Sequence, residues 1–179
     1  MQQDFKFCPQ CACTLDKKPL HGVERFICAG CGFIFWRNPI VGVAVIARQG
    51  DTILLGRRAR GEYSGQWCIP CGYVECDEHV RAAAQREFLE ETGLIVDIGD
   101  VYTVHSNFHN PKVQTVGIWF NGVVTGGVLA ANDDLEAVEY VPLGAMADLP
   151  LAFPTDALVL EQLRNEHRDA TPLRHHSEP

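Results

Sequence analysis

The alternation of apolar and polar positions along the chain predicts a series of short β-strands interrupted by two helices. Val41 to Arg48 and Thr52 to Gly56 are rich in β-branched residues and flank Gln49-Gly50-Asp51, which predicts a β-hairpin. A further strand is expected to begin at Trp67. Later strands are predicted at residues 94–97, 101–106, 113–124 and 138–141. This mixed order, with one long crossover helix, predicts an α/β fold (α+β, with a mixed sheet) in which helices sandwich the sheet.

The first helix is predicted over His79 to Thr92, a stretch that lacks Gly and Pro and is rich in Ala, Glu, Arg and Leu. Asp77 is the expected N-cap, and Gly93 fits the residue after the helix, where the backbone turns left-handed. The side chains expected on the buried face are Val80, Ala83, Ala84, Phe88 and Leu89.

A second helix is predicted over Asp156 to Arg168, because Pro154 and Thr155 are typical of a helix start. The polar tail, residues 169–179, is expected to be flexible. The helical side chains expected to pack on the sheet are Leu158, Val159, Leu160 and Leu163.

Three carboxylates share one face of the first predicted helix. Glu87, Glu90 and Glu91 stand at positions i, i+3 and i+4, so their like charges crowd together near the end of the helix that already carries a negative partial charge. This arrangement costs free energy unless a cation neutralises it, and hard oxygen ligands favour Mg²⁺ or Mn²⁺ over zinc. The alternative is an ordinary solvated acidic face.

The segment from Gly72 to Leu94 fills every position of the pattern G-x5-E-x7-R-E-U-x-E-E-x-G-U, where U is apolar. The matching residues are Gly72, Glu78, Arg86, Glu87, Phe88, Glu90, Glu91, Gly93 and Leu94. The segment resembles the Nudix box. The resemblance implies a Nudix α/β/α sandwich over about residues 39–168. It also implies a hydrolase that cleaves a nucleoside diphosphate linked to another group, with water attacking phosphorus.

The resemblance also assigns roles to individual residues. Glu87, Glu90 and Glu91 would be carboxylate ligands of the catalytic Mg²⁺ or Mn²⁺ ions, and the backbone carbonyl of Cys71 or Gly72 would be a further ligand. In the same scheme, Arg86 would orient the carboxylates by charge-assisted hydrogen bonds, and Glu78 would brace the loop rather than take part in the chemistry.

The catalytic base stays open between two locations. Within the box, Glu90 and Glu91 are candidates. Outside it, Asp133, Asp134 and Glu136 form an acidic cluster before the last predicted strand, although a solvated turn would have the same composition.

Candidate substrate contacts lie outside the box. Arg57 and Arg58 belong to the run RRAR and are candidates for contacts with phosphates or ribose, with an ordinary exposed run as the alternative. Phe108, near the end of a predicted strand, and the flanking His105 and His109 are candidate contacts for a nucleobase, with structural or surface roles as the alternative.

Eight cysteines are present, and four of them have metal-ligand spacing. Cys8-x2-Cys11 and Cys28-x2-Cys31 resemble a zinc ribbon, and four thiolates would close a structural Zn²⁺ site without an open position for water. Four ordinary buried thiols are the alternative. For Cys68-x2-Cys71 a redox or zinc pair is the minor reading, because an extended strand separates its Cα atoms by about 10 Å, beyond the reach of a disulfide.

The zinc ribbon is expected to occupy residues 1–37 and the Nudix domain residues 38–168, because Asn38-Pro39 is a plausible junction. A chain of 179 residues with 46% hydrophobic content suffices for one full core and a small appendage.

The net charge of −8 argues against nonspecific binding of DNA or RNA. The start of the chain lacks the features of a signal peptide, and no apolar run is long enough for a membrane span, so a cytoplasmic protein is expected.

A zinc ribbon before a Nudix domain resembles both bacterial NADH pyrophosphatases and the FAD or ADP-ribose pyrophosphatases of plastid type. The SQPWPFPxS element of the NADH enzymes has no match at Ser106-Asn107-Phe108, whereas Leu151-Ala152-Phe153 is similar to the second group. A dinucleotide-like substrate such as ADP-ribose or FAD is therefore expected. The alternatives are hydrolysis of NADH or of damaged nucleoside triphosphates.

A zinc-ribbon module that binds RNA or protein and carries a Nudix sensor domain is the non-enzymatic alternative. A homodimer formed through the ribbon is a further expectation.

Overall fold

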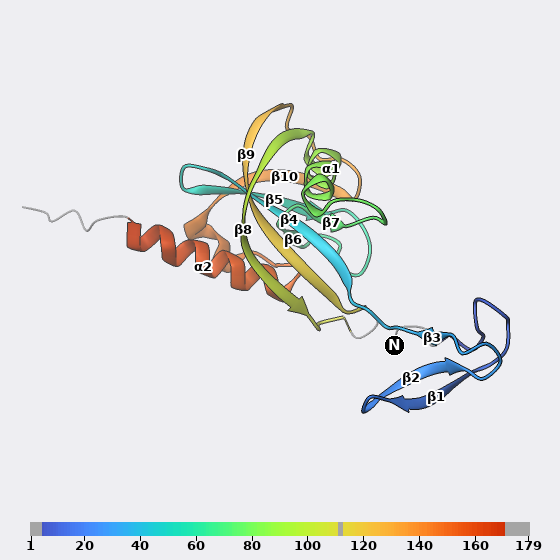
Figure 1. Ribbon diagram of the computed structural model, residues 1–179. Coiled ribbons are helices and arrows are strands. Elements are labelled where there is room, and N and C mark those ends of the chain that lie inside the picture. Colours follow the sequence, from blue (N-terminus) through green and yellow to red (C-terminus); the bar gives the residue numbers. More distant parts are fainter. Residues whose placement is uncertain (1–4, 111–112, 171–179) are drawn as a thin grey trace, which may run out of the picture.

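The computed structural model describes residues 5–110 and 113–170, which form one large mixed sheet, two α-helices and a separate small sheet (Figure 1). The strands of the large sheet are β4 (Ile40–Gln49), β5 (Thr52–Arg58), β6 (Trp67–Cys68), β7 (Cys71–Tyr73), β8 (Leu94–Asn107), β9 (Thr115–Gly127) and β10 (Leu135–Pro142). Their main order is β10-β5-β4-β9-β8, with β6 paired to β5 and β7 paired to β4. Strands β4 and β9 are parallel, which makes the sheet mixed.

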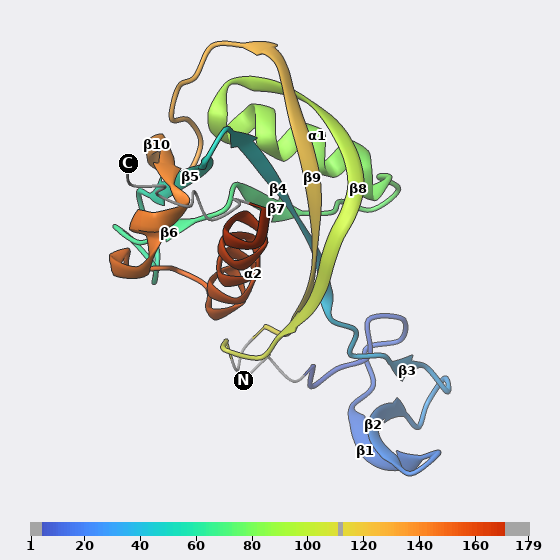
Figure 2. The same cartoon turned by 90° about the vertical axis from the view of Figure 1, so that its left-hand side faces the viewer.

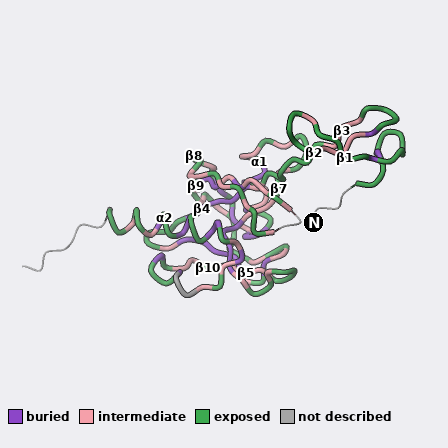
Figure 3. Tube along the Cα trace, turned by 90° about the horizontal axis from the view of Figure 1, so that it is seen from below, coloured by how far each residue is buried: buried purple, intermediate pink, exposed green. Residues whose placement is uncertain are grey.

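Strand β4 explains why both faces of the sheet are covered. Successive side chains of a strand point to opposite faces. Val43, Val45 and Ala47 accordingly pack with helix α1 (Val80–Thr92), whereas Ala44 and Ile46 pack with helix α2 (Pro154–Ala170). The two helices lie on opposite sides of the sheet, and the buried residues concentrate between them (Figures 1 and 3). The predicted α/β/α sandwich is confirmed.

Helix α1 begins and ends near the predicted positions, but its N-cap differs. His79 is the N-cap, and its ring nitrogen accepts a hydrogen bond from the backbone N–H of Arg81. The prediction of Asp77 was wrong, because Asp77 lies in the preceding turn with φ 64°. Gly93 ends the helix with φ 70°, as predicted, and its N–H donates to the carbonyl of Leu89. Leu89 itself is exposed, contrary to prediction, so the buried face is narrower than expected.

Helix α2 is longer than predicted at both ends, and it follows a 3-10 helix, η1 (Leu143–Asp148), which the sequence pattern did not indicate. Val159, Leu160 and Leu163 are buried against the sheet, whereas Leu158 is exposed and was wrongly assigned to this face. The predicted tail overlaps the end of α2 at Asp169, and residues 171–179 lie outside the described residues.

Strand β8 is continuous where two strands were predicted. It pairs with β9 from Leu94 to Asn107. The pairing shifts register near Ile98 and Val101, which accommodates the polar residues between the two apolar runs. A β-bulge of this kind bends a strand without ending it. The hairpin predicted at the start of the domain is present as β4 and β5.

The small sheet comprises β1 (Leu15–Leu20), β2 (Val23–Cys28) and β3 (Ile34–Phe35), all antiparallel. It lies beyond the start of β4, away from α1 and α2 (Figure 2). Its core consists of Cys8, Leu15 and Cys28, against which three phenylalanines pack in part. Within the described part of the chain, every helix is too short or too polar to cross a membrane.

Candidate active site and cysteine cluster

A cavity of about 390 Å³ opens beside the carboxylate end of α1. This volume lies within the range of small-molecule sites. Its wall combines Gly42 to Ala44 of β4, Cys71 to Tyr73 of β7, and Glu87 and Glu91 of α1. The pairing of β4 with β7 brings Gly72 opposite Val43 and so places the first glycine of the box against the helix.

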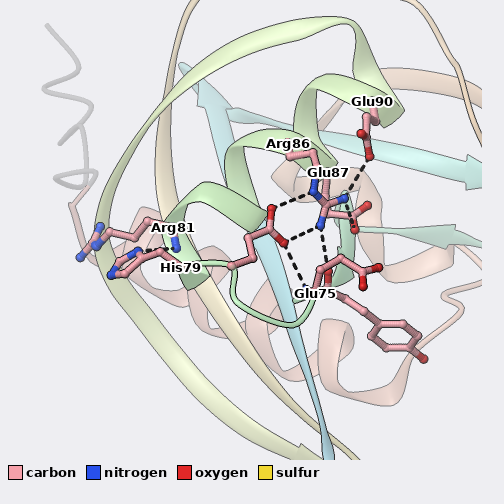
Figure 4. Close-up of polar contacts among 8 residues, drawn as sticks. Glu75, His79, Arg81, Arg86, Glu87 and Glu90 are labelled. Carbon is pink, nitrogen blue, oxygen red and sulfur yellow. Dashed lines mark hydrogen bonds and ion pairs between the residues drawn. The ribbon is translucent and has the colours of Figure 1, made fainter.

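Arg86 joins the carboxylates of the box (Figure 4). Its Nε and Nη2 each donate to Glu78 at 2.8 Å, while its Nη1 donates to Glu87 at 2.8 Å and to Glu90 at 3.1 Å. Nη2 also donates to the carbonyl of Tyr73 at 3.1 Å. The hydrogen bonds from Arg86 lower the pKa of Glu78 to about 2. The geometry thus agrees with an orienting role for Arg86 and a bracing role for Glu78.

Glu91 is the most buried of the three helix carboxylates, with 2% of its surface exposed. Its Oε2 accepts a hydrogen bond of 2.8 Å from the backbone N–H of Cys71. Burial raises the pKa of Glu91 well above its usual range, and burial also raises the pKa of Glu87. A bound cation favours the charged form of a carboxylate and would offset the cost of burying it, so both acids suit a role as metal ligands.

The three helix carboxylates do not all face the cavity. Glu87 and Glu91 line the cavity, whereas the Glu90 side chain is 50% exposed and is turned toward Arg86. Among the described residues, the four cysteines Cys8, Cys11, Cys28 and Cys31 are the one group of three or more potential ligands whose atoms all lie within 4.8 Å of one another. The residues fit a Mg²⁺ or Mn²⁺ site if Glu87, Glu91 and a neighbouring carbonyl oxygen supply its protein ligands, with Glu90 at its edge.

The candidates outside the box fall into two groups. Arg58 lines the cavity and donates to Asp134 at 2.7 Å, and Asp133 and Asp134 also line it. Arg57 and Glu136 pair with each other at 2.8 Å, and the cavity wall does not include them. Phe108, which is 71% exposed, is likewise not part of that wall.

Residues at the start of α2 also line the cavity, although the sequence indicated only a helix start there. Asp156 is buried and accepts hydrogen bonds from the backbone N–H of Ile69 at 3.0 Å and from the indole N–H of Trp119 at 3.2 Å. Burial raises the pKa of Asp156 to about 7. An acid at this position is ordinarily explained by the helix dipole, so no sequence signal distinguished this one.

The sulfur atoms of the four ribbon cysteines gather in a single cluster. Cys8 and Cys31 approach to 3.5 Å, and Cys11 and Cys28 to 3.4 Å. A tetrahedral zinc with Zn–S bonds of ~2.3 Å separates its sulfurs by roughly 3.8 Å, so a small expansion would admit the ion. Backbone hydrogen bonding with Cys31 lowers the pKa of the Cys28 thiol to about 7, whereas hydrogen bonding with Cys11 raises the pKa of the Cys31 thiol to about 12. The cluster therefore has the geometry and chemistry of a zinc site.

The second Cys-x2-Cys pair differs from the first. Cys68 is fully buried, and its Sγ donates to the carbonyl of Gly56 at 3.7 Å. Hydrogen bonding with Cys68, together with burial, raises the pKa of the Cys71 thiol well above its usual range. A thiol that keeps its proton is a poor nucleophile, which agrees with a packing role.

Together, the sandwich fold, strand β7 with Gly72 beside Glu87 and Glu91, and the arginine that holds Glu87 and Glu90 define a class of hydrolases. Enzymes of this class cleave a diphosphate with the help of divalent cations.

A model of the NUDIX domain matches residues 36–163, and the chain therefore belongs to the Nudix family. It is a Nudix-type pyrophosphatase, in a family whose enzymes use divalent metal ions.

Two relatives extend the comparison. An ADP-ribose pyrophosphatase of Methanocaldococcus jannaschii is 35% identical over 129 residues, which are 71% of this chain and 75% of the relative. A crystal structure of a NUDIX hydrolase from Nitrosomonas europaea has a TM-score of 0.81 and 28% identity, and the match covers 98% of this chain and 95% of that one. The similarity to the second protein thus includes the cysteine-bearing sheet.

A third relative matches a shorter part of the chain. The NAD-capped RNA hydrolase NudC of Vibrio cholerae is 31% identical over 97 residues, which are 54% of this chain and 35% of the relative.

Proposed function

We propose that this enzyme hydrolyses a nucleoside diphosphate linked to another group, with Mg²⁺ or Mn²⁺, and that its substrate is dinucleotide-like, such as ADP-ribose or FAD. The observation that carries the proposal is the pair of partly or fully buried carboxylates, Glu87 and Glu91, in one cavity with Gly72. The similarity to an ADP-ribose pyrophosphatase over most of the chain supports the substrate class.

The residues of the box would have different roles in this reaction. Glu87, Glu91 and the carbonyl of Cys71 or Gly72, with Glu90 at the edge of the site, would hold the cations, which when bound polarise the diphosphate oxygens and lower the pKa of water. Arg86 would keep Glu87 and Glu90 oriented through its Nη1. Glu91 stays in place because the N–H of Cys71 holds one of its oxygens.

The base is best sought among the acids that line or border the cavity. Glu90 is exposed at its edge, and Asp133 and Asp134 form part of its wall. Glu136 is a weaker candidate, because Arg57 neutralises it outside the cavity wall.

A substrate screen with Mg²⁺ tests this proposal. The purified protein should release AMP from ADP-ribose or FAD, and Glu90→Gln and Glu91→Gln should abolish turnover without unfolding the protein. Glu139→Gln, an exposed change on β10, is the matched control. Full activity of Glu90→Gln and Glu91→Gln on every substrate would contradict the metal assignment. Release of pyrophosphate from a triphosphate, with no AMP from the dinucleotides, would contradict the substrate class.

The remaining expectations belong to the same proposal. Residues 1–37 would form a ribbon around a structural Zn²⁺, supported by the four clustered sulfurs, and residues 38–168 would form the catalytic unit. The protein would act in the cytoplasm as a homodimer, without binding nucleic acid. Size-exclusion chromatography with light scattering, zinc analysis and an RNA-binding assay at varied salt test these points.

A further inference from the structure

Part of the cavity wall carries polar atoms that the protein itself leaves unsatisfied. Arg58 Nε, Asn107 Oδ1 and Thr155 Oγ1 are buried and have no hydrogen-bond partner among the residues that the structure describes. All three residues line the cavity that contains Glu87 and Glu91. Thr155 is 8% exposed, so its hydroxyl is nearly sealed from bulk water. Buried polar groups without partners cost free energy, and several around one cavity indicate a ligand that supplies the partners.

The free atoms differ in what they can bind. Asn107 uses its Nδ2 to donate to Thr115 Oγ1 at 2.9 Å, which leaves Oδ1 as an acceptor. Arg58 uses its Nη2 to donate to Asp134 at 2.7 Å, which leaves Nε as a donor. The hydroxyl of Thr155 can donate or accept. A complementary ligand therefore needs both donors and acceptors.

Three aromatic rings line the same cavity. Tyr63 and Phe153 have ring centroids 5.4 Å apart, and His109 lies 5.7 Å from Phe153. The guanidinium of Arg58 lies 5.7 Å from the Phe153 ring centroid. We call Tyr63, His109 and Phe153 the aromatic wall. Flat ligands bind well beside such rings, and a polar edge on the ligand would satisfy the free atoms.

We infer that the aromatic wall and the three free polar atoms bind the nucleobase of the substrate, and that Thr155, Asn107 and Arg58 contact its polar edge. This inference rests on the proposed function, because the base would be joined to the diphosphate held near Glu87 and Glu91. A phosphate fits this part of the cavity poorly. Arg58, the arginine of the described cavity wall, is already paired with Asp134, and the carboxyl groups of Asp133 and Asp156 also line this wall.

Thr155→Val is the discriminating variant. Valine keeps the shape of threonine and removes a hydroxyl that has no hydrogen-bond partner among the described residues. The melting temperature should therefore stay the same or rise. Thr125→Val, an exposed change on β9 outside the cavity wall, is the matched control.

The activity readout is a ratio between bases. The kcat/KM value is measured for ADP-ribose, for analogues with hypoxanthine or cytosine in place of adenine, and for a base-free ribose diphosphate. The wild type should prefer one base. Thr155→Val should lower kcat/KM for that base about three- to ten-fold, the value of one hydrogen bond, and so reduce the preference. Asn107→Leu should do the same, and Asn107→Asp, which retains an acceptor, should keep most of the preference.

Equal losses for all bases and for the base-free compound would overturn the inference, because the residues would then act on ribose or phosphate. Unchanged ratios in both Thr155→Val and Asn107→Leu would also overturn it. If no nucleoside diphosphate is cleaved, the proposed function fails separately. Calorimetric binding of AMP against ribose 5-phosphate then tests the base site without catalysis. AMP should bind more tightly, Thr155→Val should weaken that binding, and equal affinities would refute the base site.

Discussion

Gly72→Ala should inactivate the enzyme while leaving its fold intact. A Cβ atom on Gly72 would overlap the carboxylate of Glu87, both at its carbon and at its two oxygens. Non-bonded atoms approach favourably only to about 3.5–4.0 Å, so the carboxylate must retreat by roughly 1 Å or more. Glu87 can move because it is the end of a flexible side chain, but it would then leave its place in the cavity.

The substitution Gly72→Ala should change the stability of the protein only slightly and the rate of hydrolysis strongly. Displacement would weaken the ion pair of 2.8 Å between Arg86 and Glu87, which at this partly exposed position is worth about 0.2–1 kcal/mol. The backbone of Gly72 lies outside the left-handed region, so alanine gains about 0.4–1 kcal/mol through the unfolded chain. The free energy of unfolding should therefore change by less than about 1 kcal/mol. A misplacement of ~1 Å at a catalytic group costs on the order of 100-fold in rate.

The assay pairs initial rates of Mg²⁺-dependent hydrolysis with thermal unfolding. Gly144→Ala is the matched control, because a Cβ at Gly144 meets nothing within 4 Å. If Gly72→Ala hydrolyses the best substrate within three-fold of Gly144→Ala, the assignment of Glu87 to the metal site is refuted. If Gly72→Ala is unfolded, the reasoning about the flexible side chain is refuted instead.

Three further predictions concern other parts of the molecule. Arg86→Lys should lower kcat by roughly ten-fold or more, because one ammonium cannot replace the two-pronged contact with Glu78 and the link to Glu87; an unchanged kcat would contradict an orienting role. A strong chelator should release one zinc per chain and melt the β1–β3 sheet, whose strands pair with one another and with no other described strand, without altering the melting of the large sheet. Simultaneous melting of both sheets would contradict the independent stability of the small sheet. The pKa of Asp156 is raised from 3.8 to about 7, so its stabilising contribution is fully present below pH ~4 and is lost as the pH rises through ~7. The loss is roughly 4 kcal/mol, and Asp156→Asn should remove this part of the pH dependence in denaturant titrations.

The sequence determined the local features of the protein because they depend on spacing along the chain. The 3.6-residue period of a helix placed Glu87 and Glu91 near each other, and Gly93 marked the helix end through its backbone freedom. The Cys-x2-Cys spacing likewise predicted a four-sulfur cluster, because each pair forms a tight turn. Such features require no knowledge of which distant segments meet.

Helix boundaries and exposure were less predictable. Asp77 and His79 are both able to cap a helix, and only the course of the preceding turn favoured His79. Leu89 and Leu158 are apolar residues in good helical positions. Both are exposed because each helix covers the sheet with a narrower face than its composition suggests.

Only the tertiary structure decided the composition of the cavity. Arg58 meets Asp134 across 76 positions of sequence, and Ile69 meets Asp156 across 87. The pairing of β4 with β7 and the docking of α2 bring these segments to one cavity, and neither is encoded in a local pattern. The sequence thus identified the residues expected to handle the diphosphate, because they lie on one helix. The residues that border the rest of the cavity come from distant segments, which only packing of the sheet and helices brings together.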